Sequence, residues 1–187
     1  MLDNSSVESI NDVESIQIFI NTFLDMRVIE LSETTQILIL TALKSSPKKQ
    51  EWEEVKENIQ KYWDSSTNRT FYILFDLEHV GIMPQRMIVE WVALFEHNRN
   101  VSISQILGCS IRITTTLVRN AVKLFSKLYK PETPVLIFKK FKTSYLSIIN
   151  NYKYRIQTNT LIPQLGANYV DGQEHNQNDP VILVDAS

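Results

Sequence analysis

The sequence predicts a single α/β domain in which a mostly parallel sheet is covered by helices. The main indication is the run Phe71–Asp76, whose unbroken apolar and aromatic residues are typical of a strand buried on both faces. Similar β-prone runs alternate with amphipathic helical patterns along the chain, which favours parallel strands joined by helices. A length of 187 residues is enough for one well-packed core and short for two.

The first half of the chain begins with three short β-prone runs, at residues 16–20, 26–31 and 34–41. A Ser/Pro/Lys loop at 45–49 separates them from a helix. That helix is predicted by apolar residues at spacings of three and four: Trp52, Val55, Ile59 and Tyr62. Turn residues at 64–68 end it before the buried strand 70–76 and the loop 77–83.

The second half predicts helix, strand, helix, strand and helix. Pro84 suits the first turn of a helix that ends near 97–100 and directs these residues inward: Met87, Ile88, Trp91, Val92 and Phe95. After a strand at 106–113, the next helix has a predicted inward face of Leu117, Val118, Ala121, Val122, Phe125 and Leu128. A strand at 135–139 and a short helix at 143–150 complete the pattern.

We divide the chain into a flexible N-terminal lead at 1–15, one α/β domain at 16–151, and a polar, acidic C-terminal extension at 152–187. The extension contains one apolar island, residues 181–184. Three interpretations of the island stay open: an edge strand on its own sheet, an edge strand on a neighbouring copy, or a disordered end.

Composition narrows the class of protein. The longest apolar runs are too short to span a bilayer, and the polar, acidic N-terminus lacks the pattern of a secretory signal. The single cysteine, Cys109, cannot form an intrachain disulfide and fits a reducing compartment, so we expect a cytoplasmic protein. Four glycines leave little material for phosphate-binding loops.

Charge is segregated along the chain although the net charge is only −2. Residues 1–40 carry seven acids and one base, whereas residues 111–155 carry ten bases and one acid. Six of these bases form the candidate anion-binding set: Arg119, Lys123, Lys127, Lys139, Lys140 and Lys142. They would suit an acidic protein, an anionic lipid surface or, less well, nucleic acid. The interpretation we favour is that the acidic ends neutralise this face within the fold or a dimer.

The order of elements over residues 26–150 resembles the STAS family, the anti-sigma-factor antagonists and their relatives. The closest local similarity is Asp76-Leu-Glu-His-Val-Gly-Ile-Met83, which matches the family's strand end of Asp-Leu-x-x-Val-x and two apolar residues. The family's next four positions, typically Asp-Ser-Ser/Thr-Gly, are Pro84, Gln85, Arg86 and Met87 here. No hydroxyl is present to accept a phosphate, so the family's phosphorylation switch is not expected. The larger CRAL-TRIO lipid-binding domains share the strand-plus-Asp pattern.

The resemblance implies a protein partner that is bound by the loop after Asp76 and the adjoining helix. The candidate partner-binding residues are His79, Val80, Ile82, Met83, Gln85 and Arg86. Self-association is a further expectation for such a module.

Catalytic chemistry is weakly indicated. Asp76 at a strand end suits a catalytic carboxylate, but such residues more often bind backbone amides and organise a loop. His79 is expected to be a partly exposed loop residue, and Cys109 a small buried hydrophobe. The three histidines and one cysteine have no zinc-ligand spacing, and no cofactor fingerprint is present. We therefore expect no enzyme, metal or cofactor.

Three hypotheses for function remain. The first is a non-catalytic protein–protein interaction or scaffold module that belongs to a larger assembly; a filled core with an exposed apolar loop at 80–84 would favour it. The second is an anion-surface or lipid-binding module that uses the bases at 119–142, for which an internal cavity would be distinguishing. The third is a small enzyme, which would be favoured by a pocket holding both Asp76 and His79.

Overall fold

The computed structural model describes residues 7–128, 133, 135–159 and 181–182. The strands are β1 (Ile16–Ile20), β2 (Leu24–Glu30), β3 (Thr35–Ala42), β4 (Thr70–Asp76), β5 (Ile106–Arg112), β6 (Val135–Phe138) and β7 (Val181–Ile182). The helices are a short 3-10 helix η2 (Ile10–Asp12), α1 (Lys49–Ser65), α2 (Gln85–His97), α3 (Arg99–Gln105), α4 (Thr116–Leu128) and α5 (Phe141–Thr158). The sequence did not predict η2 or α3.

The seven strands form one sheet in which strand order follows chain order, from β1 at one edge to β7 at the other. Pairing is parallel from β3 to β6 and antiparallel at both edges. The predicted α/β class, with a largely parallel sheet covered by helices, is confirmed, and it is consistent with a STAS-like fold. The apolar island at 181–184 supplies β7, which pairs with β6 of the same chain.

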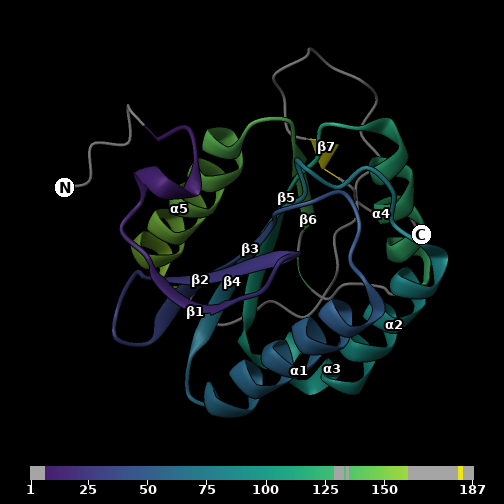
Figure 1. Cartoon of the computed structure of the whole chain (residues 1–187). Coiled ribbons are helices and arrows are strands. Elements are labelled where there is room, and N and C mark those ends of the chain that lie inside the picture. The colour runs from purple at the N-terminus through teal and green to yellow at the C-terminus, as the bar shows by residue number, and fades with distance from the viewer. Residues whose placement is uncertain (1–6, 129–132, 134, 160–180, 183–187) are drawn as a thin grey trace.

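Helices cover the two faces of the sheet unequally. Figure 1 shows α5 on one side and α1, α2, α3 and α4 on the other. Successive right-handed crossovers between neighbouring parallel strands place their helices on the same side, which explains the grouping. The molecule therefore has two separate cores, one on each face of the sheet.

The larger core lies under α1, α2 and α4. Helix α1 buries Trp52, Val55, Ile59 and Trp63. The first three were predicted, whereas Tyr62, the fourth predicted residue, is only partly buried. Its first turn is fixed by Glu51, whose Oε2 accepts the Lys48 amide at 2.6 Å. Aromatic rings connect the helices: Trp63 and Phe95 are 5.2 Å apart between centroids, and Phe95 and Phe125 are 5.9 Å apart.

The smaller core lies under α5, which is longer than the predicted helix at 143–150. It buries Phe141, Ser144, Tyr145, Ile148 and Ile149 against the sheet. Its last turns are held by polar contacts that the hydrophobic pattern does not reveal. The Tyr72 hydroxyl and Asn151 Oδ1 are 2.8 Å apart, and Arg155 Nη2 donates to the Leu107 carbonyl at 3.2 Å. These contacts extend the helix to Thr158.

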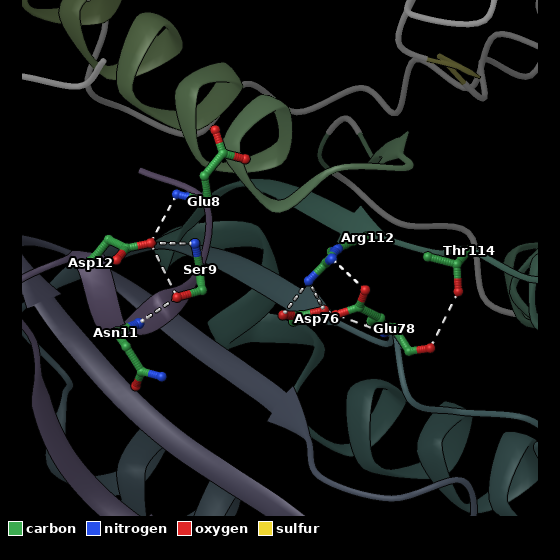
Figure 2. A network of polar contacts seen from close by, with 8 residues as sticks. All are labelled: Glu8, Ser9, Asn11, Asp12, Asp76, Glu78, Arg112 and Thr114. Carbon is green, nitrogen blue, oxygen red and sulfur yellow. Dashed lines mark hydrogen bonds and ion pairs between the residues drawn. The ribbon is translucent and has the colours of Figure 1, made fainter. Parts of the chain in front are cut away.

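The N-terminal segment differs from the flexible lead expected at 1–15. From residue 7 onward it packs on the smaller core, with Val7, Ile10 and Val13 buried. Asp12 Oδ2 accepts the amides of Glu8 at 2.9 Å and Ser9 at 2.7 Å, closing a short turn (Figure 2). Apolar residues spaced by three make this turn amphipathic, and the sheet supplies the surface that buries it.

Two isoleucines test whether packing in the larger core stabilises the protein. Ile59 in α1 is 1% exposed and Ile156 in α5 is 50% exposed. Ile59→Ala should lower the free energy of unfolding by roughly 2–5 kcal/mol, because it leaves a cavity in the core. Ile156→Ala should change it by less than about 0.5 kcal/mol. Urea denaturation of both variants measures the difference, and equal costs would contradict the proposed core.

Candidate functional site

A row of polar side chains crosses the sheet near the carboxyl ends of its central strands. Consecutive pairing joins Asp25 of β2 to Thr41 of β3, Thr41 to Asp76 of β4, and Asp76 to Arg112 of β5. Paired residues project from the same face of a sheet, and this is the face that α5 covers, since Phe75 and Ile111 belong to the opposite core. The carboxyl edge of parallel strands is where α/β proteins usually place their working loops.

Asp76 is the most constrained member of this row. It is buried, and its carboxylate lies 3.2 Å from Arg112 Nη1. Burial raises the pKa of the Asp76 carboxyl above its ordinary value of 3.8, whereas the Arg112 guanidinium opposes that shift. The pair thus keeps a charged group in a position from which water is largely excluded.

The Asp76–Arg112 pair organises the loop that follows β4. Asp76 Oδ1 accepts the Glu78 amide at 3.3 Å, and Arg112 Nη2 lies 2.6 Å from Glu78 Oε1. Thr114 donates its hydroxyl to the Glu78 carbonyl at 3.2 Å (Figure 2). This is the loop-organising arrangement that we favoured for Asp76.

Two atoms of the row have unused hydrogen-bonding capacity. Thr41 Oγ1 and Arg112 Nε are buried and have no hydrogen-bond partner in the described part of the chain. The sequence analysis singled out Asp76 but missed Asp25, Thr41 and Arg112 as its neighbours. The available signal was a polar residue at the end of each apolar strand, and strand register was needed to align them.

The structure separates the candidate partner-binding residues into two groups. His79, Ile82, Gln85 and Arg86 are exposed, and Ile82 is 62% exposed. Val80 and Met83 instead pack toward the larger core. The Val80 amide donates to the Leu77 carbonyl at 3.1 Å, a tight turn that directs the Val80 side chain inward. Val80 is therefore buried and does not contribute to a surface.

Helices α2 and α4 also expose apolar side chains. On α2, Val89 is 51% exposed. On α4, Leu117 and Leu128 were predicted to face inward, but they are exposed together with Leu124. Residues at i, i+7 and i+11 share one helix face, about a third of a turn from the buried pair Val118 and Val122. The helix has only one core to contact, so this second apolar stripe remains on the surface.

The six candidate anion-binding bases do not lie together on one surface of the protein. Arg119 and Lys123 are half-buried on α4, whereas Lys142 belongs to α5 across the sheet, and the Lys127 side chain lies outside the described residues. Lys139 and Lys140 are exposed between β6 and α5. Lys142 Nζ lies 3.6 Å from Glu8 Oε1, so one acid of the N-terminal block does neutralise one of these bases.

A partly open cavity of about 100 Å³ lies between the sheet and α2. Its walls contain neither Asp76 nor His79, so it does not provide the pocket that would favour an enzyme. Cys109 lines it and is half-buried. Among the described residues, no three His, Cys, Asp or Glu side chains gather where they would hold a metal ion.

No helix in the described part of the chain combines the length and apolar character needed to cross a membrane. Comparisons with protein-family models, curated proteins and solved structures gave no match.

The raised pKa of the Asp76 carboxyl should make the stability of the protein depend on pH. Its pKa is higher in the folded than in the unfolded chain, so the folded state binds the proton more tightly. Its contribution to stability should therefore be greatest below pH 3.8 and should decrease as the pH rises through the folded pKa.

Asp76→Asn removes this titration. Urea unfolding between pH 3.5 and 7 should show that wild-type stability, relative to this variant, falls with rising pH and then levels off. A difference that rises with pH over this range would show that the Arg112 charge, rather than burial, controls the Asp76 pKa.

Proposed function

We propose that this protein is a non-catalytic protein–protein interaction module. Its contact surface, which we term the loop–α2 surface, consists of Ile82, Gln85, Arg86 and Val89. The observation that carries the proposal is the presence of two large apolar side chains, Ile82 and Val89, exposed on a loop and helix that are otherwise well anchored. Isolated exposed hydrophobes are common, but apolar groups with a polar rim on a fixed framework are typical of interfaces.

The loop that carries Ile82 is fixed at several points. The Asp76–Arg112–Glu78 contacts hold its beginning. The Leu77 amide donates to the Arg112 carbonyl at 3.0 Å, and the Gly81 amide donates to the Ser45 carbonyl at 3.2 Å. A preorganised loop loses little conformational entropy on binding, which favours affinity.

Helix α2 is fixed against α1 by Glu90. Its carboxylate accepts the Trp52 indole N–H at 2.7 Å and lies 2.9 Å from Lys56 Nζ and 2.5 Å from Arg86 Nε. Hydrogen bonds from Arg86 and Lys56 lower the pKa of Glu90 to about 2, so these contacts persist at neutral pH. Val89, the preceding residue, is thereby held outward.

The resemblance to the STAS family supports the same surface, because it implies partner contacts through the loop after Asp76. The positions that hold the family's phosphoacceptor are Pro84 to Met87 here, so we propose binding that phosphate does not control. We further propose a scaffold role in a cytoplasmic assembly, supported by the single cysteine and the absence of a recognisable catalytic motif.

Val89→Asp tests the surface, with Ile156→Asp as the matched control. Both residues are half-exposed aliphatics on helices, at 51% and 50%, and Ile156 lies on the opposite side of the sheet. A partner would first be captured from native cells at moderate salt and identified, and its affinity would then be measured with purified proteins. Val89→Asp should weaken binding by roughly 30-fold or more, as for a buried contact residue.

Ile156→Asp should leave the affinity unchanged, and circular dichroism should show both variants folded. Equal affinity for Val89→Asp and the wild type would exclude the loop–α2 surface. Association that disappears at moderate salt and is lost in the Lys139→Glu/Lys140→Glu variant would instead assign the function to anion binding. A stoichiometric second copy of this chain as the captured partner would identify self-association.

A further inference from the structure

The larger core is incompletely filled beneath α2. On the sheet, the cavity is bordered by Phe75, Ile111 and Val135, which are 9%, 7% and 8% exposed. On the other face of the same sheet, Ile37, Ile39 and Leu74 are all 0% exposed. Even Cys109, in the central strand β5, is only half-buried. These positions near the strand ends are therefore packed less completely than Ile37, Ile39 and Leu74 on the face that α5 covers.

Flexible side chains line the cavity on the side of α2. Met87 and Trp91 of α2 and Met83 of the preceding loop line it. Methionine side chains are flexible and polarisable, which lets a pocket adjust to differently shaped apolar molecules. The ring centroid of Trp91 lies 5.5 Å from that of Phe75 and 5.2 Å from that of Trp52. Aromatic rings therefore form part of the cavity wall.

The chemistry of the walls restricts what can bind. Among the described residues that line the cavity, none is charged, and only Thr133 and Cys109 carry a hydroxyl or a thiol. Burial raises the pKa of the Cys109 thiol, so it stays neutral at physiological pH. A charged or strongly hydrated molecule would lose its water shell without gaining compensating contacts.

We propose that this cavity is a binding site for a neutral, apolar small molecule with the bulk of a single aromatic ring or a short alkyl chain. Its volume of about 100 Å³ is similar in scale to engineered apolar cavities of roughly 150 Å³ that bind benzene. Ile82 of the loop–α2 surface also lines the cavity, but the proposal does not depend on a protein partner at that surface.

Methionine methyl NMR of the isolated chain tests the proposal, with benzene as the probe. The chain has four methionines, of which Met83 and Met87 line the cavity and Met26 is a buried residue outside its lining. Benzene should shift the Met83 and Met87 methyl resonances along one saturable binding curve and leave Met26 unmoved. Benzoate, which adds a charge to the same ring, should cause no shift at the same concentrations.

Cys109 offers a matched pair of variants. Cys109→Leu adds volume that fills the cavity, whereas Cys109→Ser keeps its size. Benzene binding should be lost in the leucine variant and retained in the serine variant. If the leucine variant does not fold, Val122→Ile replaces it as the test. This variant adds one methylene group to the cavity from α4 and should weaken benzene binding.

Several outcomes would overturn the site: no saturable shift in the wild type, an equal shift of Met26, or unchanged binding in both enlarged variants. None of these measurements involves a protein partner. Failure here would leave the interaction proposal standing, and failure of partner binding would leave the cavity proposal standing.

Discussion

Strand β4 is buried on both faces, and the rest of the structure is arranged around this constraint. It pairs in parallel with β3 on one side and β5 on the other, so its backbone polar groups are satisfied within the sheet. Its side chains alternate between the two cores: Ile73 and Phe75 face α1, α2 and α4, whereas Tyr72 and Leu74 face α5. A strand of this kind needs cover on both sides, and the five α-helices provide it.

The same alternation determines the chemistry at the end of the strand. Asp76 follows Phe75, so its side chain projects to the α5 face, beside Thr41 and Arg112 in the neighbouring strands. A buried carboxylate is costly unless it is paired, and the Arg112 guanidinium supplies that partner. Arg112 also binds Glu78, so the pairing that compensates for burial also fixes the start of the loop that leads to α2.

The two sides of helix α2 consequently face different environments, solvent and the cavity. Its outer side presents Val89 and Arg86, which belong to the proposed loop–α2 surface. Its inner side presents Met87 and Trp91 to the cavity above β5. Glu90 ties the helix to Trp52 and Lys56 of α1, so its position is fixed by a polar bridge as well as by apolar packing.

The sequence by itself determined the α/β class, the strand at 70–76, and the helices beginning near 49, 85 and 116. These features follow from local periodicity, because a few neighbouring residues reveal a strand or an amphipathic helix. Tertiary structure alone decided the partners of Asp76, the inward turn of Val80, the outward face of Leu117 and Leu128, the packing of Val7 and Ile10, and the full length of α5. Each depends on strand register or on which surface a distant element supplies, and contacts between residues far apart in the chain leave no periodic pattern near either of them.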